Sequence, residues 1–206
     1  MLGEHVELCS DSPETYFVHA PGLTVVTPAT VADAYSLLRA SLRHPDPVMF
    51  LEPKSRYRHR EVVELPTATE PFAKAVVGRT GTDATVVAYG PSLHVAMAAA
   101  DIAFAEGRSL EVVELCTLMP FDEGTVLESV ARTGRCGGVH ESPLTLGFGA
   151  EVAARVSEEL FGRLRAPVLR VTGFDTPYPP ARLERNWLPD PERVLDAVDR
   201  ALGDGG

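Results

Sequence analysis

Cysteine is scarce in this sequence, and its three copies form no recognisable motif. Cys9, Cys116 and Cys136 are widely separated and include no C-x-x-C pair, so neither a zinc finger nor a dithiol redox centre is indicated. Three widely spaced cysteines fit a reducing compartment better than a disulfide framework. We expect Cys116 to be buried in a strand.

Long apolar runs and targeting segments are also missing. No apolar run approaches the roughly 20 residues that a membrane span requires. The amino terminus lacks the basic segment followed by an apolar one that marks a secretory signal. We therefore expect a cytoplasmic protein with no membrane partner.

Positive charge is in the minority. The chain has 19 Lys and Arg against 29 Asp and Glu, and a formal net charge of −10. The basic residues are scattered apart from a short cluster at 54–60, which argues against nucleic-acid binding because phosphates need clustered cations. No G-x-G-x-x-G follows an expected strand, and neither a P-loop nor the G-x-S-x-G of a serine hydrolase occurs.

Short apolar runs alternate with amphipathic runs along most of the chain. This pattern predicts an α/β fold with a mostly parallel sheet covered by helices on both faces. Helix starts are indicated by Thr30 with Asp33, by Ser92, by Asp122 and by Asp190 before Pro191. The expected strands are 23–27, 48–51, 84–89, 110–115, 137–139 and 168–171, and the expected longer helices are 31–42, 92–106, 122–132, 148–164 and 191–202.

The alternation is interrupted between residues 52 and 83, a polar stretch with several prolines and a short β-like piece at 72–77. We predict a first domain at 1–65, a linker with a short β piece at 66–82, and a second domain at 83–206. The β-α-β unit of the first domain is too small to bury both faces of a sheet. Residues 1–65 therefore look like the tail of a larger domain.

Residues 140–151 occupy a strand-to-helix crossover, where open α/β folds place ligands. His140 and Glu141 stand at the expected end of the strand, and Gly147 and Gly149 would let the backbone turn into the helix. His140 and Glu141 could be acid–base partners, yet neighbouring strand residues point to opposite faces. A catalytic role and a structural one, with His140 hydrogen-bonded to the backbone, both remain open.

Nearly the whole chain resembles the carboxyl-terminal two-thirds of the beta subunit of the 2-oxo acid dehydrogenase decarboxylase component, in the transketolase-like thiamine diphosphate superfamily. The resemblance implies an incomplete pyrimidine-domain β-α-β tail followed by a transketolase carboxyl-terminal-type domain. The matching stretches, in family order and spacing, are 12–17, 19–28, 46–54, 57–58, 83–90, 111–120, 133–135, 140–151, 166–171, 175–177 and 188–190.

The resemblance also implies cofactors and partners. The family uses thiamine diphosphate and Mg²⁺, which an alpha-type subunit would bind or help to bind, because it carries the diphosphate-binding part and the missing pyrimidine-domain part. No complete cofactor site is expected in this chain alone. Self-association would give a heterotetramer, and a lipoyl or acyl carrier domain would be a further partner.

The same resemblance indicates site residues. The loop of Cys9, Ser10, Asp11 and Ser12 matches the family's active-site loop, and Cys9 stands where the family has a His that faces cofactor and substrate. A thiol in place of an imidazole weakens recognition of a substrate carboxylate, whereas Ser10 and Ser12 could hydrogen-bond hydroxyls. His140 is a further candidate. The positions that hold a structural potassium ion in some family members are Ser41, His44 and Asp46.

These expectations combine into one functional hypothesis with two alternatives. The chain would be a subunit of a split thiamine diphosphate-dependent complex that is inactive alone. The complex would transfer an acyl or ketol (two-carbon) unit from a ketose or 2-oxo acid donor to a lipoyl or carrier-protein thiol. The first alternative is a beta-subunit fragment of a pyruvate or branched-chain 2-oxo acid dehydrogenase, and the second is a non-catalytic dimerisation or docking module.

Overall fold

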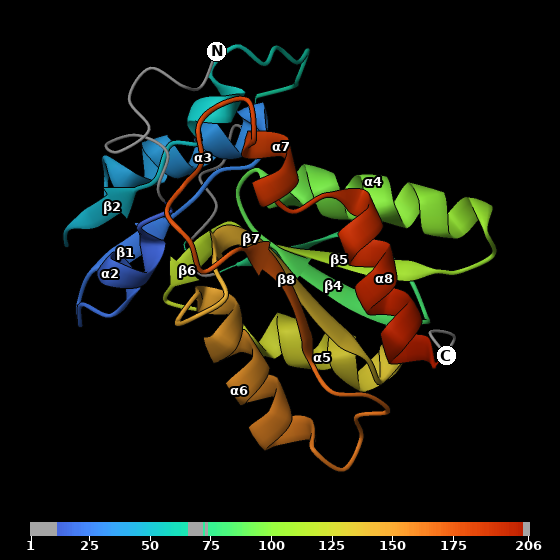
Figure 1. The fold of residues 1–206 in the computed structure, drawn as a ribbon. Helices are drawn as coiled ribbons and strands as arrows, with labels where there is room; N and C mark the ends of the chain where they lie inside the picture. Colours follow the sequence, from blue (N-terminus) through green and yellow to red (C-terminus); the bar gives the residue numbers. More distant parts are fainter. Residues whose placement is uncertain (1–11, 66–71, 73, 204–206) are drawn as a thin grey trace.

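The computed structural model describes residues 12–65, 72 and 74–203 (Figure 1). A small sheet and a larger one lie next to each other, so the architecture is α/β, as the alternation predicts. Cys9, Ser10 and Asp11 lie outside the described residues.

The small sheet has three strands in the order β2-β1-β6. β1 and β2 run parallel, as the β-α-β pattern predicts, and β6 pairs antiparallel with β1. The predicted capping box of α3 is present: Thr30 Oγ1 accepts from Asp33 N at 3.1 Å, and Asp33 Oδ2 accepts from Thr30 N at 2.8 Å. The elements are α2 (Glu14–Val18), β1 (Thr24–Val26), α3 (Val31–Ser41), β2 (Val48–Phe50), the 3-10 helix η1 (Lys54–Arg56) and β6 (Thr117–Met119).

The larger sheet has five strands in the order β3-β5-β4-β7-β8. All neighbouring strands are parallel except β3 and β5, so the sheet is mostly parallel, as predicted. The strands are β3 (Ala75–Arg79), β4 (Ala84–Ala88), β5 (Leu110–Leu115), β7 (Cys136–Pro143) and β8 (Leu169–Gly173). The helices are α4 (Ser92–Ala105), α5 (Glu123–Thr133), α6 (Phe148–Leu160), α7 (Glu184–Trp187) and α8 (Pro191–Leu202).

Helices cover both faces of the larger sheet, because successive strand residues point in opposite directions. Val86 and Val112 pack with α4 and α8 in one apolar core, whereas Val87 and Val113 pack with α5 and α6 in another. Figure 1 shows α4 and α8 on one side of the sheet and α5 and α6 on the other. No helix among the described residues combines the length and the apolar character needed to cross a membrane.

The two sheets share apolar cores. Val25 of β1 belongs to the core under α5 and α6, and Val26 packs with Leu37 and Cys116 in a third cluster. β6, which follows β5 after Cys116, reaches into the small sheet. The predicted boundaries at 65 and 83 remain a prediction, and β3, which lies between them, belongs to the larger sheet.

Several local predictions differ from the structure. Ser92 is the first residue of α4 and not its cap, because Pro91 occupies the cap position. β7 continues to Pro143, so His140 and Glu141 lie inside the strand. Two short elements, β6 and α7, carry no periodic pattern that could reveal them. Cys116 is buried as predicted, but it lies between β5 and β6 and not within a strand.

The apolar face of α3 that the residue spacing indicates is not the face that is buried. Val31, Ala34 and Leu38 share a face by their spacing, and such a face is normally buried. Instead Leu37 and Ala40 are the buried residues, and the side chain of Leu38 is 47% exposed. Val31, Ala34 and Leu38 line an apolar hollow of about 250 Å³ between α3 and the segment after β2.

Candidate functional site

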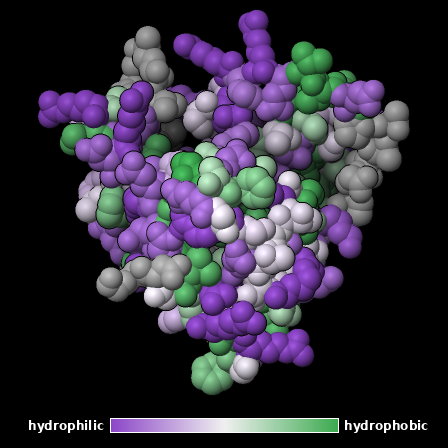
Figure 2. Space-filling model, turned by 90° about the vertical axis from the view of Figure 1, so that its right-hand side faces the viewer, coloured by the Kyte–Doolittle hydropathy of each residue, from purple (hydrophilic) through white to green (hydrophobic). Residues whose placement is uncertain are grey.

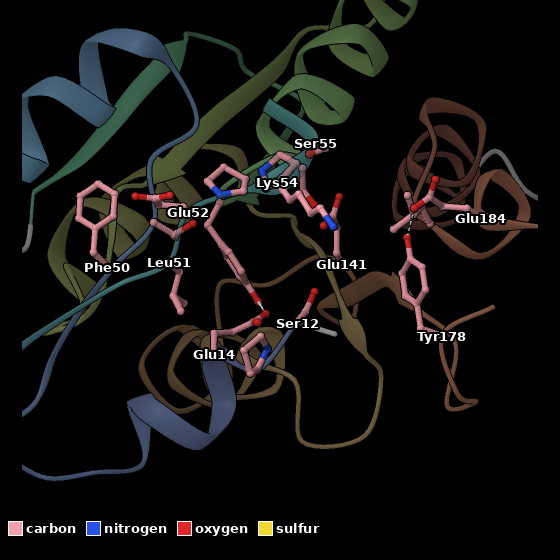
Figure 3. Close-up of a pocket in the computed structure, with 17 residues that line it drawn as sticks. Ser12, Glu14, Phe50, Leu51, Glu52, Lys54, Ser55, Glu141, Tyr178 and Glu184 are labelled. Carbon is pink, nitrogen blue, oxygen red and sulfur yellow. Dashed lines mark hydrogen bonds between the residues drawn. The ribbon is translucent and has the colours of Figure 1, made fainter. Parts of the chain in front are cut away.

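A cavity of about 320 Å³ lies where the two sheets meet. Its walls come from the segments that follow β1, β2 and β4, from β7, from the start of α2, and from the region around α7. Carboxyl ends of parallel strands from both sheets thus converge on one space, which is the usual ligand position in α/β folds. The labelled polar side chains that line it in Figure 3 are Ser12, Glu14, Glu52, Lys54, Ser55, Glu141, Tyr178 and Glu184.

Two of the lining residues, Glu14 and Tyr89, are hydrogen-bonded to each other. Glu14 is only 4% exposed although it is ionisable, and its Oε1 accepts a hydrogen bond of 2.6 Å from the hydroxyl of Tyr89. Burial and the neighbouring Glu14 raise the pKa of Tyr89 well above its ordinary value, so Tyr89 remains a donor. Thr15 Oγ1 also donates to Leu146 O at 3.2 Å, which fixes α2 beside the segment after β7.

His140 packs against Tyr89. Its ring stacks on Tyr89 with centroids 5.7 Å apart, and its Nδ1 lies 2.8 Å from Ser142 Oγ and 3.2 Å from Ser142 O. The side chain is 1% exposed, and burial lowers its pKa to about 4, so the imidazole is neutral at pH 7. Of the two roles considered for His140, the contacts favour the structural one.

Packing against His140, and not the predicted tight turn, explains the glycines at positions 147 and 149. Gly147 has an ordinary φ of −60°, and the positive φ of 59° belongs to Leu146. A Cβ on Gly147 would lie 2.5 Å from His140 Cε1, and a Cβ on Gly149 would lie 2.5 Å from His140 Nε2. Gly149 is needed because the buried imidazole occupies the space of a side chain, and at Gly147 the imidazole and Pro143 O, also 2.5 Å away, both do so.

Glu141 lines the cavity (Figure 3), whereas its neighbour His140 does not, which agrees with the alternation of side chains along a strand. Burial, and then the nearby carboxylates of Glu14 and Glu184, raise its pKa to about 7. Glu184 accepts a hydrogen bond from the hydroxyl of Tyr178, and burial raises the pKa of Tyr178. Glu141 is therefore a carboxyl group that can give or take a proton near neutral pH.

The charge of the cavity is negative. Glu14, Glu52, Glu141 and Glu184 line it, and Lys54 is the one basic side chain among the described lining residues. Such a wall suits hydroxyl groups and cationic rings, and it repels phosphate. The buried Ser92 Oγ has no hydrogen-bond partner among the described residues and lies on the cavity wall, so it is available to a bound molecule.

The predicted site residues are only partly brought together. Ser12 lines the cavity, and Cys9, Ser10 and Asp11 precede it outside the described residues. Ser41 is the last residue of α3, and its Oγ donates to Leu37 O at 2.7 Å. His44 and Asp46 lie in the segment that follows, where Asp46 N is 3.3 Å from His44 Nδ1. Potassium binding there remains a prediction.

Sequence reasoning missed most of the cavity wall. Tyr89 and Glu52 could have been found, since Tyr89 ends one expected strand and Glu52 directly follows another, at the edge where ligands bind. Tyr178 and Glu184 give no such signal, because Tyr178 lies in an irregular segment and Glu184 begins a helix of one turn.

Replacement of Tyr89 by Phe should lower the free energy of unfolding by about 1–3 kcal/mol, because it removes the hydrogen-bond donor of the buried Glu14. Urea denaturation measures this loss. Tyr16→Phe is the matched control, since Tyr16 is 83% exposed. Equal stabilities of the two variants would contradict the assigned role of Tyr89.

Comparison with known families and proteins agrees with the resemblance inferred from the sequence. Residues 73–194 match the family model of the transketolase C-terminal domain, and residues 8–60 match that of the transketolase pyrimidine binding domain. The 3-methyl-2-oxobutanoate dehydrogenase subunit beta of Mycobacterium tuberculosis (strain CDC 1551 / Oshkosh) is 54% identical over 194 residues, which cover 94% of this chain and 56% of that protein.

A second relative is the pyruvate dehydrogenase E1 component subunit beta of Leifsonia xyli subsp. xyli (strain CTCB07). It is 48% identical over 197 residues, which cover 96% of this chain and 58% of that protein. The chain thus spans a little over half the length of these curated relatives.

A solved structure described as a split gene transketolase, inactive beta4 tetramer, has a TM-score of 0.79 and 27% identity. The match covers 92% of this chain and 60% of that one. The predicted fold class is confirmed by this similarity and by both family models. The chain belongs to the transketolase C-terminal domain family, carries a pyrimidine-binding-domain segment before that domain, and is related to the beta subunits of 2-oxo acid dehydrogenases.

Proposed function

We propose that this chain forms the beta-type part of a thiamine diphosphate-dependent complex that decarboxylates a 2-oxo acid and passes the acyl group to a lipoyl or carrier-protein thiol. The observation that carries the proposal is the cavity at the meeting point of the two sheets, because residues matched to two cofactor-associated domains line it together. The names of the relatives supply the class of donor.

The residues of the cavity fit one end of the cofactor. A cavity of about 320 Å³ is within the range of small-molecule sites. Its carboxylates and the unpartnered Ser92 Oγ suit the cationic and hydrogen-bonding rings of thiamine, with Glu14 and Glu141 as the residues that would face them. When bound, thiamine diphosphate would supply the nucleophilic and electron-accepting ring that decarboxylation of a 2-oxo acid needs.

In this proposal the diphosphate and its Mg²⁺ are bound outside the cavity. The described lining residues offer Lys54 as their one cation, and four carboxylates would repel a diphosphate. An alpha-type subunit therefore supplies the diphosphate and Mg²⁺ site, and the chain is inactive without it. Within the cavity, Glu141 holds or releases a proton at neutral pH, and Tyr89 keeps Glu14 in place.

The open face of α3 is the surface we propose for the partner that completes the small domain. A three-stranded sheet with one covering helix buries little apolar area, and Val31, Ala34 and Leu38 remain accessible beside the hollow of about 250 Å³. By contrast, the face in Figure 2, where α4 ends, presents mostly hydrophilic residues with hydrophobic ones in small groups.

Leu38→Asp should weaken assembly with the alpha-type partner by at least about tenfold, because it puts a charge into an apolar contact. The side chain of Leu38 is 47% exposed, so the isolated chain should keep its stability. Co-purification and thermal unfolding measure the two effects. The control is Phe161→Asp, because Phe161 is exposed at the end of α6, far along the sequence from α3. Unchanged assembly of the Leu38 variant would remove α3 from the interface.

The decisive test of function is reconstitution with the alpha-type subunit. Thiamine diphosphate binding is measured by calorimetry, and turnover is measured with 3-methyl-2-oxobutanoate and pyruvate in the presence of a lipoyl domain. We expect binding and turnover only for the mixed complex. A mixed complex that forms but neither binds the cofactor nor decarboxylates these acids would refute the proposal and favour a docking role.

A second candidate is transfer of a two-carbon ketol unit from a ketose. It is supported by Cys9, which by the resemblance stands where the family has a histidine, and by a cavity wall that favours hydroxyl groups over a carboxylate. In the reconstituted complex, Cys9→His should raise turnover of 2-oxo acids relative to ketoses by about tenfold or more. Cys9→Ser, which adds no cation, is the control. An unchanged ratio for Cys9→His would exclude Cys9 from donor selection.

A further inference from the structure

A second cluster of ionisable side chains lies away from the cavity. Asp33 of α3, Glu114 of β5 and Cys116 between β5 and β6 each present a donor atom, and these three atoms lie within 4.8 Å of one another. None of the three lines the cavity. The cluster joins the helix of the small domain to a strand of the larger sheet.

The cluster has more acceptors than the protein satisfies. Glu114 is 5% exposed, and its Oε1 has no hydrogen-bond partner among the described residues. The ion pairs of the described residues include none to Asp33 or Glu114. An unpaired buried carboxylate is costly unless it is protonated or meets a cation.

The net effect of the surroundings is to raise the pKa of Glu114. Burial, and then the carboxylate of Asp33, raise the pKa of Glu114 to about 8, and the Cys116 thiol opposes this by hydrogen bonding. Burial and the same two carboxylates raise the pKa of Cys116.

Asp33 is already oriented for a ligand. Both hydrogen bonds from Thr30 of the capping box end on Asp33 Oδ2, which fixes the carboxylate and leaves Oδ1 as its other oxygen. Asp33 is partly exposed, whereas Glu114 and Cys116 are buried.

We propose that Asp33, Glu114 and Cys116 form a site for a divalent transition-metal ion, with zinc as the best match. One sulfur and two carboxylate oxygens suit zinc, whereas magnesium and calcium take oxygen ligands alone. Donors bound to one tetrahedral zinc lie about 3.3–3.8 Å apart, so donors within 4.8 Å need only small side-chain rotations. Three protein ligands leave the fourth position to water or an incoming group.

The metal would connect the two domains at a point that the proposed cofactor does not reach. Cys116 packs with Val26 and Leu37 at the junction, so the bound ion would hold α3 against β5. This inference does not depend on the proposed function, because its readouts need neither a partner subunit nor turnover.

The test uses the full 206-residue chain, freed of metal by a chelator and titrated with Zn²⁺ and Co²⁺. We expect one ion per chain, and with Co²⁺ the near-ultraviolet charge-transfer band of a cobalt–thiolate bond. Cys116→Ser should abolish the band and weaken Zn²⁺ binding by at least about tenfold, and Glu114→Gln should weaken binding with the band retained at saturation. Cys136→Ala is the control, since Cys136 is buried within the larger sheet.

Two outcomes would each overturn the proposal: less than one ion per chain, or a band that survives Cys116→Ser. In that case the two carboxyl groups simply share a proton.

Discussion

Gly149→Ala is expected to lower the free energy of unfolding by about 2–4 kcal/mol. The added methyl group would lie 2.5 Å from His140 Nε2 and 2.8 Å from His140 Cδ2, closer than nonbonded atoms approach. The imidazole cannot easily move away, because it is buried, stacked on Tyr89 and bound to Ser142. Urea denaturation with a shared m-value measures the loss.

The matched control is Gly124→Ala in the first turn of α5. A Cβ there meets nothing nearer than 3.7 Å, and alanine is the better helix former by about 1 kcal/mol. The double variant Gly149→Ala with His140→Ala should be less destabilised than the sum of the two single variants, because the clash is gone. Additive losses would mean that His140 is not what requires the glycine.

Glu141→Gln should make the protein more stable at pH 8 by about 1–3 kcal/mol, and the difference from the parent should nearly vanish at pH 5. The folded state raises the pKa of Glu141 from 4.5 to about 7. Between these two values the folded protein binds more protons than the unfolded chain, so stability falls as pH rises. Above pH 7 the parent carries the full cost of the buried charge, and Gln removes that cost.

Unfolding curves at pH 5, 6, 7 and 8 for both proteins provide the measurement. Glu158→Gln, on the exposed side of α6, is the control and should show the same pH dependence as the parent. A gain for Glu141→Gln that does not change with pH would show that the carboxyl group ionises normally. In the reconstituted complex, the same substitution should reduce turnover if Glu141 exchanges protons with the donor.

Local chemistry made much of the fold predictable. Asp122 and Asp190 accept hydrogen bonds from Thr125 N and Arg193 N as the sequence predicts for helix caps. The apolar runs at β4 and β5 are buried on both faces, and such runs are typical of parallel strands. Where signals were short, prediction failed: β6 has three residues between Cys116 and Pro120, too few to show a period.

The candidate site was far less predictable because its parts are distant in sequence. Glu14, Tyr89, Glu141 and Glu184 come from four segments, and a hydrogen bond joins Glu14 to a residue 75 positions away. The pKa of Glu141 depends on burial and on carboxylates from two other segments, which no local pattern contains. The sequence singled out His140, whose ring stacks on the lining residue Tyr89, but its burial became visible only in the fold.

The pairing of β6 with β1 bears on whether the chain could be divided into two polypeptides that still associate. β6 is encoded with the larger sheet, yet it hydrogen-bonds to β1 in the small one, and Val25 and Leu118 share one apolar core. Continuity of the chain between residues 65 and 72 is therefore not what keeps the halves together. Two polypeptides divided in this stretch should find each other in solution and rebuild the junction, as the fragments of a complementing reporter protein do.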